Sequence, residues 1–183
     1  MATEWLAIVG TVTGAAIALV GALLADVRRE RSQRSRDREL DRWQTYAEFA
    51  EALDAAHGSL REVARSETAA RDLDLYGRAS HAVHDAGVYR IRERLLMSGT
   101  IELVKAGETA FQGLVGIRGV VRNGAGLATP EYHDAYHTFA EAIWTFRDKV
   151  RKELGEETLA PAALGRTSWS EREDCPLCSQ AGS

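Results

Sequence analysis

The sequence lacks the short motifs that accompany most nucleotide-binding and hydrolytic enzymes. It contains no G-x-x-x-x-G-K phosphate loop, no G-x-G-x-x-G turn, no G-x-S-x-G nucleophile elbow and no H-E-x-x-H metal helix. No segment after residue 26 alternates apolar and polar side chains with the period of a half-buried β-strand. The sequence therefore predicts an all-α protein without an enzymatic activity.

Lysine is also scarce, because only three of the 23 basic residues are lysines. This bias toward arginine is typical of a GC-rich bacterial genome. The 27 acidic residues outnumber the basic ones and give a net charge of -4, with an isoelectric point near 5.8. An acidic chain of this kind is not expected to bind nucleic acid in general.

One stretch without any charge, residues 5–25, dominates the N-terminal part of the chain. As a helix its 21 residues would extend ~30 Å, the thickness of the hydrocarbon core of a bilayer. It has no polar face. Trp5 is its first residue, and indole rings prefer this position at the level of the lipid headgroups. We expect a transmembrane helix here. A cleaved signal peptide would need a basic start, whereas residues 1–4 hold only Glu4, and a buried core helix of this length is unusual.

The charges on either side of this stretch predict its orientation. Five arginines lie in residues 28–36, and no basic side chain lies in residues 1–4. Arginines that flank a membrane span stay in the cytoplasm. We therefore expect a single-pass protein of the inner (cytoplasmic) membrane, embedded in the lipid bilayer, with residues 1–4 outside. Residues 26–42 should form a charged juxtamembrane helix with ion pairs between residues four apart.

A stripe of small residues repeats every fourth position within the predicted span: Gly10, Gly14, Ala18 and Ala22. On a helix these residues share one side, which lets two backbones approach closely in lipid. The stripe predicts a homo-oligomer. The alternative is that glycine and alanine are simply common in membrane helices.

Residues 43–155 repeat apolar side chains at helical spacing four times. The first seam runs from Leu40 to Ala64 and the second from Leu73 to Leu95, where Ser98 and Gly99 end it. The third runs from Leu103 to Val121, and the fourth runs from Tyr132 to Leu154 after the start signal Thr129-Pro130-Glu131. Four helices with short connections predict an antiparallel four-helix bundle, with a fourth seam close to that of a coiled coil.

Three glycines interrupt the third seam at Gly113, Gly116 and Gly119. Each interior glycine costs a helix up to ~1 kcal/mol relative to alanine. Either a neighbouring helix approaches closely at these positions and compensates for the cost, or the segment is kinked or frayed.

Residues 156–183 lose helical periodicity and predict a disordered tail, which ends in Cys175-Pro176-Leu177-Cys178. Two thiolates at this spacing are half of a tetrahedral zinc site. The motif resembles the zinc hook of SMC-like DNA-repair ATPases over these four residues only, and the resemblance implies that two chains share one metal. Because the chain has no other cysteine, a four-thiolate site would also need two chains. A redox disulfide and two free thiols are the alternatives, so the expected cofactor is none or zinc.

The five histidines are the other candidates: His57, His81, His84, His133 and His137. In an antiparallel bundle, His57, His81 and His137 would lie at a similar level, as a metal-binding or pH-sensing cluster would need. The alternative is a core histidine at position 57 and surface histidines elsewhere.

These patterns predict a membrane-anchored, non-enzymatic scaffold that self-associates and presents its bundle to a cytoplasmic protein partner. The alternative is a zinc-dependent or redox-dependent membrane-tethered sensor that uses the cysteine tail.

Overall fold

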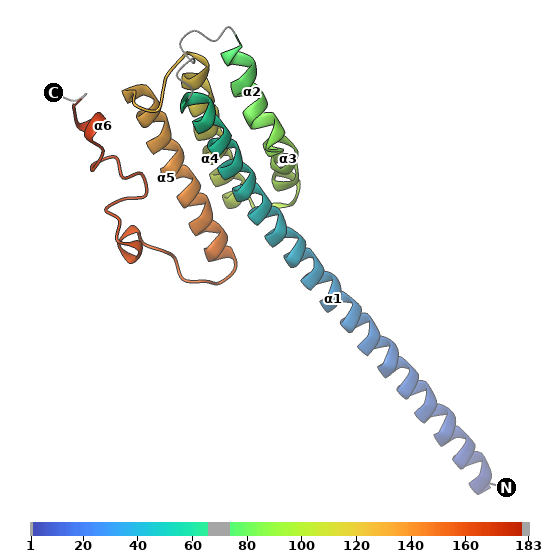
Figure 1. The fold of residues 1–183 in the computed structure, drawn as a ribbon. Helices are drawn as coiled ribbons and strands as arrows, with labels where there is room; N and C mark the ends of the chain where they lie inside the picture. The colour runs from blue at the N-terminus through green and yellow to red at the C-terminus, as the bar shows by residue number, and fades with distance from the viewer. Residues whose placement is uncertain (1, 66–73, 181–183) are drawn as a thin grey trace. The chain divides into compact units, whose positions relative to one another are not determined.

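The computed structural model describes the backbone of residues 2–65 and 74–180, and the side chains of residues 26–65 and 74–178. These residues form helices and no strand, so the all-α class is confirmed (Figure 1). The elements are α1 (Ala2–Arg65), α2 (Leu75–Asp85), α3 (Val88–Ser98), α4 (Ile101–Arg122), α5 (Pro130–Glu153), the 3-10 helix η2 (Pro161–Leu164) and α6 (Pro176–Gln180).

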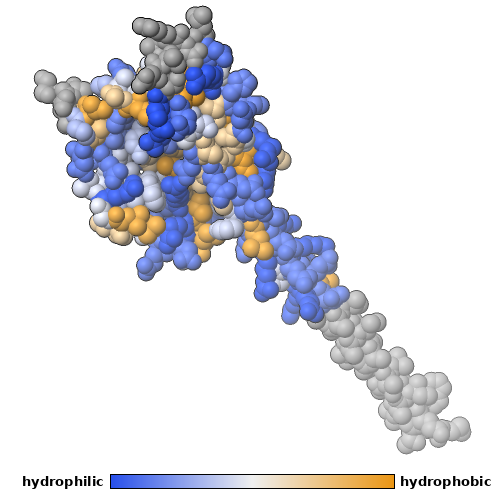
Figure 2. Space-filling view, in the orientation of Figure 1, coloured by the Kyte–Doolittle hydropathy of each residue, from blue (hydrophilic) through white to orange (hydrophobic). Residues whose placement is uncertain are grey.

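The chain divides into two compact units, residues 1–41 and residues 42–183. The described side chains of the first unit, residues 26–41, are all exposed and mostly hydrophilic (Figure 2). Arg34 pairs with Glu30 at 2.5 Å, four residues earlier. The predicted ion pairing along this charged helix is therefore present.

The predicted membrane span, residues 5–25, lies outside the residues whose side chains are described. Among the residues that are described, no helix combines the length and the apolar character needed to cross a bilayer. The small-residue stripe also falls within residues 5–25 and stays a prediction.

The second unit is a helical bundle built from the end of α1, the α2–α3 pair, α4 and α5. Figure 1 shows that the end of α1, the α2–α3 pair, α4 and α5 run in alternating directions, with α2 and α3 following the same direction. The seam predicted for the third helix is buried along its whole length, from Leu103 to Val121. Phe49 of α1 meets Phe146 of α5 edge to face at 5.3 Å in the same core. Burial of these apolar faces drives the helices together.

The start of α5 follows the sequence signal. Thr129 is the N-cap, its side chain accepts a hydrogen bond from the backbone N–H of Tyr132 at 3.3 Å, and Pro130 begins the helix. The cap satisfies a backbone donor that the helix leaves free.

Helix α4 approaches α5 closely at one of the three glycines. A Cβ atom added at Gly113 would lie 2.9 Å from the Cα atom of Phe139, whereas one added at Gly116 or Gly119 would meet nothing within 4 Å. The close approach therefore compensates for the helix cost of Gly113 alone. The other two glycines lie within the unbroken helix, so the segment is not frayed there.

The second predicted helix is divided into two helices in the structure. Gly87 has a φ of +69°, in the left-handed region that glycine adopts without strain, and it separates α2 from α3. In α2 the buried residues are Leu75, Ala79 and Val83, whereas Tyr76 is 66% exposed.

The C-terminal part also differs from the predicted disordered tail. Residues 156–178 include η2 and the start of α6, and two of their side chains, Trp169 and Cys175, are buried. The indole of Trp169 stacks on Trp144 of α5, with ring centroids 4.4 Å apart and an interplanar angle of 9°. The lost helical periodicity reflects an irregular chain that packs through single side chains.

Gly113→Ala is expected to lower the free energy of unfolding by about 1–2 kcal/mol, because overpacking against the α5 backbone outweighs the gain in helix propensity. The matched control, Gly116→Ala, places its Cβ atom in open space and should gain up to ~1 kcal/mol. Thermal unfolding of the two variants, followed by circular dichroism, measures the difference. Equal shifts would show that the helices do not approach closely at Gly113.

Candidate metal centre

Two histidines of α5 lie beside the cysteine tail. His133 and His137 are one helical turn apart, and their ring centroids are 6.0 Å apart. His137 and Cys175 are buried, and His133 is half-buried. One potential ligand atom from each of these three residues lies within 4.8 Å of the other two. The structure therefore brings together side chains that are 42 positions apart in the sequence.

The hydrogen bonds of His133 define which of its nitrogens carries the proton. Nε2 lies 2.9 Å from the backbone carbonyl oxygen of Leu127, which can only accept, so Nε2–H donates this bond. The other nitrogen, Nδ1, then carries a lone pair. It lies 3.3 Å from the Sγ atom of Cys175, so the lone pair faces the thiol.

His137 also donates one ring N–H to a backbone carbonyl, but it uses Nδ1 where His133 uses Nε2. Its Nδ1 lies 2.5 Å from the backbone carbonyl oxygen of Ser170 and donates to it. Its Nε2 is buried and has no hydrogen-bond partner among the described residues. A buried polar nitrogen without a partner is costly. Histidines that bind metals usually donate their other N–H to a carbonyl or carboxylate in this way.

The two thiols differ in their affinity for protons. The neighbouring imidazole of His137 and the backbone N–H groups of Cys178 and Leu177 lower the pKa of Cys175 to about 6, although burial opposes them. Burial and the adjacent Cys175 raise the pKa of Cys178. Cys178 lies beside Cys175 but is not in the group of three residues, His133, His137 and Cys175, whose ligand atoms lie within 4.8 Å of one another.

Contacts of the residues that precede the cysteine pair hold the tail on α5. Arg172 forms an ion pair with Asp134, one residue after His133. Ser168 accepts a hydrogen bond from the backbone N–H of Glu171 at 2.9 Å, which closes the turn that carries the Ser170 carbonyl. With the Trp144–Trp169 stack, these contacts position the tail along the helix face that presents both histidines.

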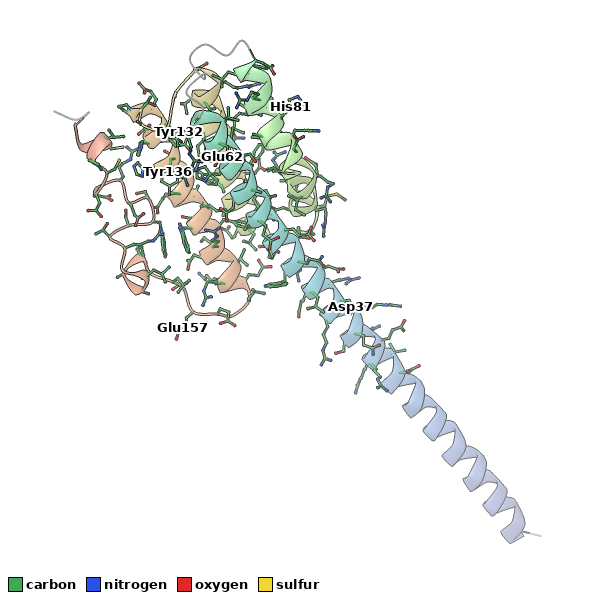
Figure 3. All side chains as sticks on the ribbon, viewed as in Figure 1. Asp37, Glu62, His81, Tyr132, Tyr136 and Glu157 are labelled. Carbon is green, nitrogen blue, oxygen red and sulfur yellow. The ribbon has the colours of Figure 1, made fainter. Side chains whose placement is uncertain are left out.

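A small cavity, lined in part by His133, lies between α1 and α5. It has a volume of about 190 Å³, and its lining includes His57, Tyr132 and Tyr136. Tyr132 and Tyr136 lie on the part of α5 that faces the end of α1 (Figure 3). Burial, aided by the charge of Arg61, lowers the pKa of His57 to about 4. Burial raises the pKa of Tyr132 to about 12.

The predicted site residues are only partly brought together. Cys175 meets His137, one of the three histidines expected at one level, but the described metal-ligating group includes neither His57 nor His81. His57 packs against Tyr136 and Phe139 instead, and His81 is exposed on α2 (Figure 3). The sequence alone did not predict that His133 and His137 lie beside the cysteines. The pair of spacings, H-x-x-x-H and C-x-x-C, was the available signal.

Comparisons of the chain with protein-family models, with curated proteins and with solved structures find no match.

The lowered pKa of His57 predicts a loss of stability in acid. The folded protein keeps His57 neutral down to about pH 4, whereas the unfolded chain binds a proton near pH 6.5. Between these values the unfolded state binds more protons, so stability falls as the pH falls, by up to about 1.4 kcal/mol per pH unit. Urea unfolding at pH 7 and pH 4.5 should show a smaller loss for His57→Gln than for the wild type. The same loss in both proteins would mean that His57 titrates normally.

Proposed function

We propose that this chain binds one zinc ion through His133, His137, Cys175 and Cys178, and that the metal fastens the C-terminal tail to α5. One observation carries the proposal. Both imidazoles donate one N–H to a backbone carbonyl, which leaves their other ring nitrogen available, and a ligand atom of each histidine lies within 4.8 Å of the Cys175 sulfur.

The ligand chemistry favours zinc. Two imidazoles and two thiolates are a common tetrahedral zinc set, whereas calcium and magnesium prefer oxygen. Zinc holds such atoms about 3.3–3.8 Å apart. The separations of up to 4.8 Å among His133, His137 and Cys175 therefore need to close by only about an ångström.

Four protein ligands would leave no open position on the metal. Closed sites of this kind are structural, while catalytic zinc keeps one position for water or substrate. The ligand set therefore supports a non-enzymatic role, in agreement with the lack of catalytic motifs.

A site within one chain differs from the shared site that the cysteine pair alone suggested. In the proposed site His133 and His137 would replace the second pair of thiolates, and with Cys175 and Cys178 one chain would supply all four ligands. The two arrangements predict different metal contents, namely about one zinc per chain or about one per two chains.

The sequence supports a place for this module at the membrane. We propose that residues 5–25 span the inner membrane once, with the bundle and its zinc-fastened tail in the cytoplasm. Self-association through Gly10, Gly14, Ala18 and Ala22, and docking of a cytoplasmic protein on the bundle, complete the proposed role as a scaffold.

Full-length protein purified without an affinity tag or chelator is expected to contain about one zinc per chain by elemental analysis. His137→Gln and Cys175→Ser should each remove most of the metal, because each deletes a ligand. His84→Gln alters an exposed histidine of α2 and should retain it.

The stacked tryptophans provide an independent readout of the tail. Removal of zinc by a chelator should reduce the near-ultraviolet circular dichroism of the Trp144–Trp169 pair and expose the tail to protease. A zinc content below about one-tenth per chain that added zinc does not restore, or full retention by His137→Gln, would refute the site.

The membrane proposal predicts that the full-length protein stays in the pellet after an alkaline carbonate wash and ultracentrifugation of native membranes. Replacing Val12 and Leu19 with Asp should move the protein to the supernatant, because each buried charge costs about 2.5–3.5 kcal/mol at the centre of a span. A wild-type protein found in the supernatant would contradict a membrane span.

A further inference from the structure

The cavity between α1 and α5 is lined by groups that donate hydrogen bonds. Its lining consists of His57, Arg61, Leu127, Tyr132, His133 and Tyr136, and it encloses about 190 Å³. None of these residues is acidic, and one of them, Arg61, is a permanent cation. The described lining therefore combines positive charge with hydroxyl and imidazole groups and includes no carboxylate.

Aromatic rings form most of the wall. The imidazole of His57 stacks on Tyr136, with ring centroids 5.4 Å apart, and its Nε2 lies 3.4 Å from the hydroxyl of Tyr132. Tyr132 is buried and meets His133 edge to face at 6.3 Å. Because both tyrosines are fixed on α5 and His57 on α1, the wall exists before any ligand binds.

Arg61 has no acidic partner among the described residues. The positions three and four residues away on α1 hold His57, Gly58, Ala64 and Arg65, none of which is acidic. Two other arginines of α1 and α5 have acidic partners, because Arg65 pairs with Glu62 and Arg147 pairs with Asp54. Arg61 is thus a cation left for another anion at the edge of an aromatic cavity.

We propose that this cavity binds a small monocarboxylate with an aromatic body. The carboxylate would pair with the guanidinium of Arg61, whose planar fork matches two carboxylate oxygens. The ring would lie against Tyr136 and Leu127, and the Tyr132 hydroxyl would supply a further donor.

The charge balance favours a single negative charge. Arg61 contributes one positive charge, and the lowered pKa of His57 keeps that ring neutral at physiological pH. A dianion such as phosphate would bring a second negative charge that nothing in the lining neutralises, against aromatic walls that solvate charge poorly.

The proposal does not depend on the metal. His133 lines the cavity with its ring, but its Nε2–H is donated to Leu127 and its Nδ1 faces Cys175. Neither nitrogen is free for a ligand in the cavity. Loss of zinc and loss of carboxylate binding are therefore separate outcomes.

The test uses full-length protein in detergent micelles, with 4-fluorobenzoate as the probe and its fluorine NMR signal as the readout. 4-Fluorobenzamide has the same shape without the charge. Arg61→Gln should weaken 4-fluorobenzoate binding at least about tenfold, because the charge-assisted pair is lost. Arg65→Gln, one turn further along α1, removes an equal charge outside the cavity and should change the affinity less than about twofold. Signal common to all three proteins reports partition into the micelle.

Three results would overturn the proposal: equal binding of the wild type and Arg61→Gln, equal binding of benzoate and benzamide, or equal loss in the two arginine variants. Displacement of the probe by inorganic phosphate at equal concentration would refute the monocarboxylate class.

Discussion

The close approach of α4 and α5 at Gly113 is the constraint on which the two candidate sites depend. The backbone of Phe139 occupies the space that a side chain at position 113 would fill, so α5 has one rotational setting against the core. In that setting Phe139 and Phe146 are buried. The residues at the start of α5 are then directed to two neighbouring sides, the tyrosines toward α1 and the histidines toward the tail. Packing in the core thereby orients the side chains of both candidate sites.

The sequence predicts those parts of the fold that depend on neighbours along the helix. The stripe from Leu103 to Val121 and the Thr129 cap follow from spacing and local hydrogen bonding, and both are found as predicted. Gly87 ends α2 through a backbone angle that no periodicity reveals. Trp169 and Cys175 are isolated apolar residues in a polar segment, so the tail carries no periodic signal for packing. Their partners, Trp144 and His137, lie on a helix whose orientation is known only once the bundle is formed.

The tail shows how a short irregular segment can be held without a helix or a strand. Ser170 accepts a hydrogen bond from His137, Arg172 pairs with Asp134, and Trp169 covers Trp144. An exposed ion pair contributes at most about 1 kcal/mol, and one stacked pair contributes a similar amount beyond its burial. These contacts alone hold some 20 residues weakly against their conformational entropy. A tetrahedral ion at the cysteines would add a strong, localised attachment at the end of the segment.

His133 connects the two candidate sites through the two edges of one ring. Its Nδ1 faces Cys175, and its Nε2–H is bonded to Leu127, a residue that also lines the cavity beside Arg61. A metal bound at Nδ1 withdraws electron density from the imidazole, which strengthens the Nε2–H donor and its bond to Leu127. The two sites therefore share one imidazole ring but use different atoms of it, so zinc binding at Nδ1 and ligand binding in the cavity do not compete for the same nitrogen.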